Sequence, residues 1–90
     1  MQCEWDPEKN KRNIWKHGVS FPDAVAVLED EYAITISDES EPSEQRFVTV
    51  GMDAFARVLV VIYTYRGEKI RIISARPAGP REREQYEAQL

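Results

Sequence analysis

A long apolar, β-branched run, Val58 to Tyr65, limits the folds open to this chain. A strand that lacks polar alternation has to be covered on both faces, so this run predicts the central strand of a sheet. Arg66-Gly67-Glu68 then predicts a tight hairpin, and Lys69 to Ala75 the returning strand, which breaks at Arg76-Pro77. Elements elsewhere in the chain must therefore cover this hairpin.

Two more strands are predicted before the hairpin. Tyr32, Ile34 and Ile36 alternate with small or polar residues, as in a half-buried strand, and Arg46 to Gly51 forms the next one. A polar loop, Asp38 to Glu44, separates them. Three or four consecutive antiparallel strands in a meander follow from this order.

Helix signals lie on either side of the strands. Asp6-Pro7 begins a helix that ends near His17, and Gly18 suits its left-handed C-terminal position. Ser20, with an acid three residues later, begins a short second helix that ends near Glu29. Gly79-Pro80 begins a last helix, Arg81 to about Gln89, and Gln2 to Trp5 could add a short strand. The prediction is an α+β fold with residues 1–90 in a single domain.

Composition narrows the class of protein. An apolar content of 42% with 31% charged residues is typical of a folded domain. The single cysteine, Cys3, excludes an intramolecular disulfide and a cysteine-cluster zinc site. The N-terminus lacks the apolar run of a signal peptide, and Val58 to Tyr63 is too short to cross a bilayer. We therefore expect a cytoplasmic protein that does not associate with membranes.

Charge is segregated along the chain. The net charge is −4, yet Lys9 to Lys16 holds four basic residues and no acid. Asp23 to Glu44 holds eight acids and no base, and Arg66 to Arg83 has six bases against two acids. A basic face can therefore exist on an acidic protein. We expect the acidic segment to lie away from any anion-binding cleft, with solubility as its simplest role.

Several basic residues are candidates for a site. Arg71 lies between isoleucines, where an arginine needs a specific anionic partner. Strict alternation would place Arg71 on one face of its strand, and Ser74 and Arg76 on the other. His17 is the only histidine, the residue type best suited to proton transfer near neutral pH. With Lys16 it either caps the helix or binds a phosphate beside the glycine turn.

No known catalytic or binding motif accounts for these residues. The sequence has no Walker loop, dinucleotide fingerprint, zinc motif or Ser-His-Asp order, and one histidine without a cysteine partner argues against a structural metal site. Glu44-Gln45-Arg46 could hold a carboxylate and a guanidinium near a sheet edge, although the ends of surface strands often look the same.

Blocks spread over nearly the whole chain resemble one family, the BrnT toxins. They are Glu4-Trp5-Asp6-Pro7, the segment Asn13 to Phe21 ending in Lys-His-Gly-Val-Ser-Phe, Glu44-Gln45-Arg46-Phe47, Lys69 to Arg76, Glu82-Arg83 and Tyr86-Glu87. The resemblance implies a RelE-like fold and a ribonuclease of a type II toxin–antitoxin pair that stops translation. It also implies neutralisation by a ribbon-helix-helix DNA-binding antitoxin, BrnA, so that DNA is contacted only through the antitoxin.

The resemblance also implies an active site. Six residues inside the matching blocks become candidates: Lys16, His17, Arg46, Arg71, Arg76 and Tyr86. The two arginines of the last strand would stabilise charge on the scissile phosphate, and the histidine would be general base or acid. The lysine would bind phosphate, Arg46 would position the RNA backbone, and the tyrosine would stack a base or donate a proton. We expect neither a metal ion nor another cofactor.

One position departs from the usual sequence pattern of the family. The family often has Gly-Arg before the central strand, whereas this chain has Ala56-Arg57.

A non-catalytic co-repressor that acts with a DNA-binding partner would carry the same basic patches. So would an interaction domain whose arginines pair with the acidic segment of another copy.

Overall fold

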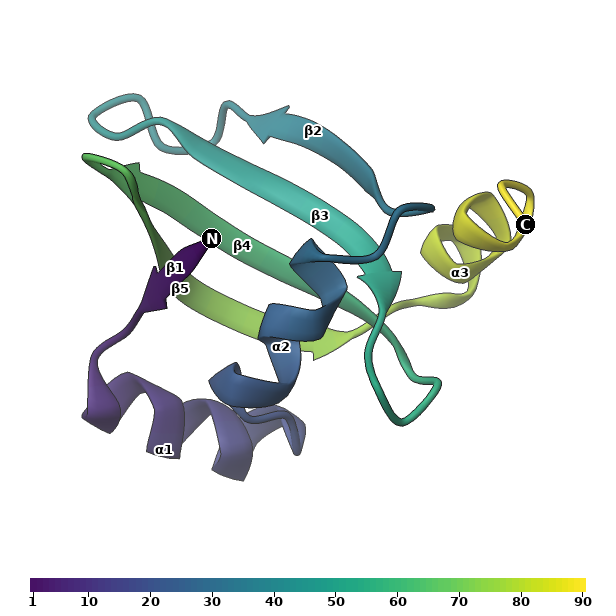
Figure 1. Ribbon diagram of the computed structural model, residues 1–90, viewed down its shortest axis with the longest axis horizontal. Helices are drawn as coiled ribbons and strands as arrows, with labels where there is room; N and C mark the ends of the chain where they lie inside the picture. The colour runs from purple at the N-terminus through teal and green to yellow at the C-terminus, as the bar shows by residue number, and fades with distance from the viewer.

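The computed structural model describes residues 1–90 as three helices and one five-stranded sheet (Figure 1). In chain order the elements are β1 (Gln2–Glu4), α1 (Pro7–His17), α2 (Phe21–Leu28), β2 (Ile34–Asp38), β3 (Arg46–Met52), β4 (Val58–Arg66), β5 (Lys69–Pro77) and α3 (Pro80–Glu87). The strand order is β1-β5-β4-β3-β2. β2 to β5 form the antiparallel meander, and β1 joins it parallel to β5. The predicted α+β fold and the additional N-terminal strand are confirmed.

The helices begin and end where their capping residues predict. The Asp6 carboxylate accepts a hydrogen bond from the Glu8 amide at 2.9 Å, which satisfies one of the unpaired donors of the first turn of α1. Gly18 ends α1 with φ of 70°. The Ser20 hydroxyl caps α2 by accepting from the Asp23 amide at 3.2 Å. None of the three helices has the length and apolarity that a membrane crossing requires.

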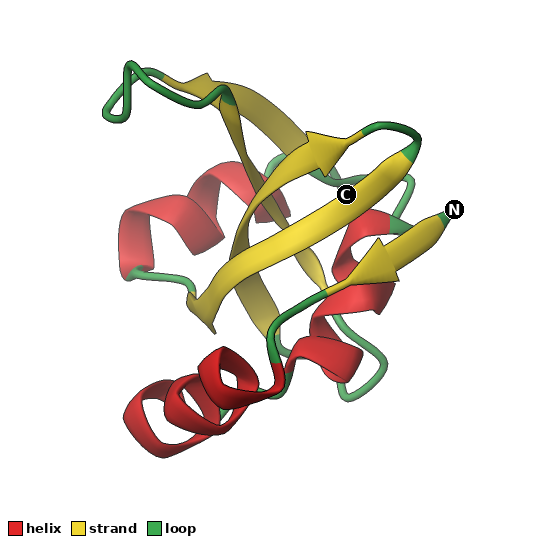
Figure 2. Ribbon diagram, turned by 90° about the vertical axis from the view of Figure 1, so that its left-hand side faces the viewer, coloured by secondary structure: helices red, strands yellow, loops and turns green.

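The central strand β4 packs against a helix on each face, as its apolar run predicts. Leu59, Val61 and Tyr63 lie in one buried cluster with α2, and Val58 and Val60 lie in a second cluster beneath α3. Figure 2 shows helices on both sides of the sheet. The eight-residue helix α3 packs mainly over β3 and one end of β4, so farther along β4 and β5 part of the face on its side remains uncovered.

A β-bulge interrupts β5. Ile62 pairs with Ser74 whereas Tyr63 pairs with Ile72, so Ile73 is an additional residue in the strand. Arg71, Ser74 and Arg76 therefore lie opposite three alternate residues of β4, Thr64, Ile62 and Val60. All three side chains occupy the α3 side of the sheet. The prediction that Arg71 lies on the other face was wrong, because strict alternation takes no account of a bulge.

The outer edge of β5 is completed by a side chain. β1 pairs only with Lys69 to Arg71, and farther along β5 the helix α1 lies beside the strand (Figure 1). There the buried Asn13 side chain donates to the Ala75 carbonyl at 2.7 Å and accepts from the Ala75 amide at 3.2 Å. It also donates to the Val19 carbonyl at 2.8 Å. These bonds replace a strand partner and fix α1 beside β5.

Candidate functional site

A shallow basic groove runs between α1 and the edge of β5. Its volume is about 430 Å³, and it is lined by Lys9, Arg12, Asn13, Lys16, His17, Ile73 and Ser74. No acidic side chain lines it. The structure therefore brings the predicted pair of Lys16 and His17 together with two basic residues that the sequence reasoning missed. Their spacing along the helix was the available signal, because residues three or four apart share a helix face.

Three arginines lie on the uncovered sheet face. Arg71 and Arg76 are there because of the bulge, and Arg46 is there because it shares a face of β3 with Val48, whose partner is Ile62. The three side chains are 30 to 39% exposed. Ser74 belongs to this face and also lines the groove, so the groove borders the arginine face.

Arg71 has the anionic partner that its position predicts. Its Nη1 donates to Glu4 Oε2 of the neighbouring strand β1 at 2.8 Å. This is the one hydrogen bond that the Arg71 guanidinium donates within the protein, and a guanidinium has five N–H donors. Arg71 is therefore held in place and retains donors for a second anion such as a phosphate.

Arg76 is engaged more fully. Nη1 and Nη2 donate to the two oxygens of Glu82 at 2.8 and 2.9 Å, and Glu82 also accepts from the Gly79 amide at 2.8 Å at the start of α3. The hydrogen bonds from Arg76 lower the pKa of Glu82 to about 2. This bidentate pair joins β5 to α3.

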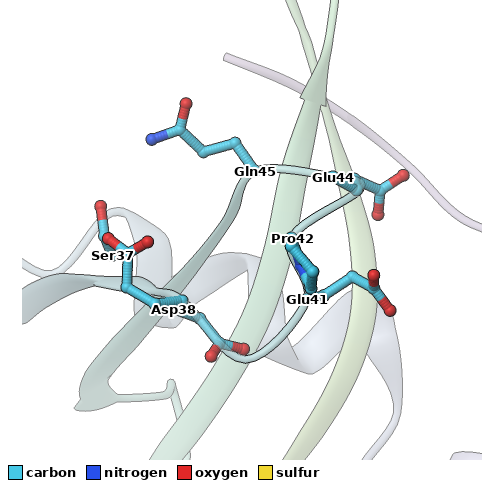
Figure 3. A pocket seen from close by; sticks show the side chains of 7 residues that line it. Ser37, Asp38, Glu41, Pro42, Glu44 and Gln45 are labelled. Carbon is cyan, nitrogen blue, oxygen red and sulfur yellow. The ribbon is translucent and has the colours of Figure 1, made fainter.

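Arg46 lies beside an acidic loop. Its Nε is inaccessible to solvent and has no acceptor within hydrogen-bonding distance, and the nearest carboxylate oxygen, Glu44 Oε1, is 3.6 Å away. Figure 3 shows the carboxylates of Asp38, Glu41 and Glu44 along this loop. Glu44 also lies 3.7 Å from Arg66. The acidic segment therefore reaches the arginine face at one end, contrary to the expectation from sequence.

Tyr86 lies apart from the other candidates. Tyr86 is a residue of α3, and its side chain is only 2% exposed between that helix and the sheet. Its hydroxyl donates to Asp30, which also accepts from the Met52 amide at 2.9 Å. Burial, followed by the hydrogen bond to Asp30, raises the pKa of Tyr86 to about 12. No ring face is exposed for a base to stack on. These contacts argue against base stacking by Tyr86 and give it a structural role, in which it fastens α3 to the sheet.

Arg57 has a structural role that could not be assigned from the sequence. Its Nε donates to the buried Asp53 at 2.8 Å, and its terminal nitrogens reach Asp23 and the Gly18 carbonyl, each at 3.3 Å. These contacts join the turn between β3 and β4 to the turn between α1 and α2. Ala56, just before it, has φ of 64°, in the region that favours glycine.

Metal-binding side chains are not gathered anywhere in residues 1–90. No three His, Cys, Asp or Glu side chains come together in a group that could hold an ion. The polar groups of the groove and of the arginine face are instead cationic or neutral donors, together with the carboxylates paired to the arginines. Such an arrangement can bind and polarise an anion.

The comparisons with known proteins agree with this arrangement. A family model described as "Ribonuclease toxin, BrnT, of type II toxin-antitoxin system" matches residues 5–82. The 1.1 Å crystal structure of the Brucella abortus ribonuclease toxin BrnT is similar in fold, with a TM-score of 0.70 and 28% identity over 88% of this chain and 97% of that chain. A comparison with curated proteins finds no match. The resemblance read from the sequence is confirmed: the chain belongs to the BrnT family of ribonuclease toxins of type II toxin–antitoxin systems.

Proposed function

We propose that this protein cleaves RNA without a metal ion, using the arginine face and the adjoining basic groove as its active site. The family match supports ribonuclease activity. The observation that carries the choice of site is the bulge in β5, because it brings Arg71, Ser74 and Arg76 to one face beside the groove that contains His17.

The reaction is internal transfer at phosphorus. The 2′-oxygen attacks the adjacent phosphorus and loses its proton to a base, while the bond from phosphorus to the 5′-oxygen breaks and that oxygen receives a proton. The products are a 2′,3′-cyclic phosphate and a 5′-hydroxyl. Negative charge grows on the phosphoryl oxygens in the transition state, where fixed cationic donors stabilise it most.

Arg71 is the principal charge-stabilising group in this proposal. It is oriented by Glu4 through a single nitrogen and keeps other N–H donors for a phosphoryl oxygen. Arg76 supports it as a positioned positive charge, because both of its terminal nitrogens are engaged by Glu82. Arg46 positions the RNA backbone through its terminal nitrogens, because the side chain is partly exposed although its Nε is inaccessible to solvent.

His17 supplies proton transfer and Lys16 binds phosphate. Both lie at the C-terminal end of α1 and line the basic groove, so in this proposal they act on the scissile bond from the β5 edge of the sheet. An imidazole serves either as base or as acid near neutral pH.

The family match also supports a proposal for the biological setting. We propose that cleavage stops translation in the cytoplasm and that a BrnA-like ribbon-helix-helix antitoxin neutralises the toxin. Contact with DNA is made by that antitoxin alone. A cationic cleft that binds RNA needs a cover of this kind, because the exposed charges would otherwise engage cellular RNA.

The test is cleavage of a defined, end-labelled RNA by purified protein free of antitoxin, with and without EDTA. We expect cleavage that survives EDTA, leaves a cyclic phosphate and falls at least about a hundredfold in Arg71→Ala. Arg81→Ala, on the outer surface of α3, is the matched control and should cleave as the wild type does. Full activity in both Arg71→Ala and His17→Ala would refute the assignment.

A non-catalytic co-repressor is the second candidate. The observation in its favour is that carboxylates of the same chain, Glu4 and Glu82, already neutralise Arg71 and Arg76. Folded wild-type protein that fails to cleave RNA, alone or with ribosomes, yet tightens operator binding by its antitoxin would establish this function instead.

A further inference from the structure

The basic groove extends beyond the residues assigned to chemistry. Lys9 and Arg12 precede Lys16 by seven and four residues on α1, so the three lie on one stripe that is about 10 Å long. All three side chains are exposed. Lys9 and Arg12 form no ion pair within the protein. By contrast, Lys11 lies on another face of the helix, with its Nζ 3.7 Å from Glu8 Oε1. The stripe therefore carries positive charge that nothing in the chain neutralises.

We infer that Lys9 and Arg12 form a backbone-binding subsite for single-stranded RNA that flanks the cleavage point. This inference rests on the proposed function, since the subsite continues the groove from His17 and Lys16 towards the start of α1. Charge complementarity identifies the ligand as a polyanion.

The lining of the groove favours RNA over a protein partner. Ile73 is its one apolar residue and no aromatic side chain lines it, although buried tryptophan and tyrosine anchors supply much of the affinity at protein interfaces. The same lack of aromatic groups leaves nothing to stack on a base. The subsite should therefore grip the phosphates and read no sequence.

The experiment uses fluorescence anisotropy with a short, fully 2′-O-methylated RNA, which cannot be cleaved, at several salt concentrations. Lys9→Gln/Arg12→Gln should weaken binding about tenfold and reduce the slope of log affinity against log salt by about 1.4, near 0.7 for each lost contact. Glutamine keeps helix propensity, and both side chains are exposed, so the fold should be unaffected. Lys11→Gln is the matched control and should bind as the wild type does. Oligonucleotides of different sequence should show the same change.

Cleavage kinetics separate this subsite from the catalytic site. In the double variant kcat should stay within about twofold while KM rises by the factor seen in binding. If the wild type cleaves nothing but the binding pattern holds, the proposed function fails and the subsite stands. An equal loss in Lys11→Gln, or unchanged RNA binding with weaker binding of the antitoxin, would overturn the subsite.

Discussion

Ala56 is the residue whose backbone least suits its side chain. Its φ of 64° places it in the left-handed region, which costs a non-glycine residue about 1 kcal/mol or more. The turn that it forms leads into Arg57, whose contacts with Asp53 and Asp23 fix the turn. The strain is therefore imposed by the network around the turn.

Ala56→Gly should raise the free energy of unfolding by about 0.5–1 kcal/mol, because relief of the strain exceeds the added flexibility of the unfolded chain. Urea denaturation followed by circular dichroism measures the change. Ala54→Gly, in the same turn but without positive φ, should lower the stability slightly. A loss of stability in both variants would contradict the strain at Ala56.

Tyr86→Phe separates structure from catalysis. The change removes the hydrogen bond to Asp30 and should cost about 1–2 kcal/mol of stability, while cleavage per folded molecule should be unchanged. A pKa raised to about 12 means that the tyrosine contributes stability below about pH 10, its unfolded value, and loses that contribution as the pH rises to 12. Denaturation curves above pH 10 should therefore converge for the two proteins. Lost cleavage in a folded variant would restore a catalytic role.

Among the elements, α1 depends on a single polar side chain to join the sheet. Asn13 makes three hydrogen bonds of 2.7 to 3.2 Å with Ala75 and Val19. Replacing it by Ala would leave the buried carbonyls of both residues and the Ala75 amide without partners, and each such group costs about 1–3 kcal/mol.

Asn13→Ala should therefore destabilise the protein by about 3 kcal/mol or more. Hydrogen exchange should show the earliest loss of protection at the Ala75 amide, before the amides of β4. Asn10→Ala is the control from the same helix, because that side chain accepts only one hydrogen bond, from the Phe21 amide. Equal protection of Ala75 in Asn13→Ala would show that another group completes the edge.

The distance along the chain between interacting residues explains how much of the fold and of the site could be predicted from the sequence. Helix ends and the meander depend on neighbouring residues, such as Asp6 before Pro7 or the apolar run of β4, and these were predicted correctly. The bulge at Ile73 has no such local sign. Asn13 meets Ala75 across 62 residues and Glu4 meets Arg71 across 67. Periodicity could identify candidate arginines, but it could not show which carboxylates hold them.

At the scale of the whole molecule, stability is tied to charge. A domain of 90 residues has a stability of only several kcal/mol, so one strong ion pair between elements matters. The pair of Arg76 and Glu82 joins the sheet to α3, and Asp30, whose pKa is also lowered, accepts from Tyr86 on the same helix. Both contacts are strongest with a charged carboxylate, so α3 should be the element most sensitive to acid.

Glu82→Gln tests this dependence. The carboxyl has a pKa of about 2 in the folded protein against 4.5 in its ordinary state, so its contribution is present above pH 4.5 and is lost as the pH falls towards 2. Because the side chain is one-third exposed, solvent screening reduces the contribution to about 1–2 kcal/mol. The variant should be less stable than the wild type by that amount at pH 7 and equal to it near pH 2. Glu84→Gln, on the exposed side of α3, is the control and should follow the wild-type stability curve at every pH. A difference in stability between Glu82→Gln and the wild type that stays constant down to pH 2 would exclude the ion pair as its cause.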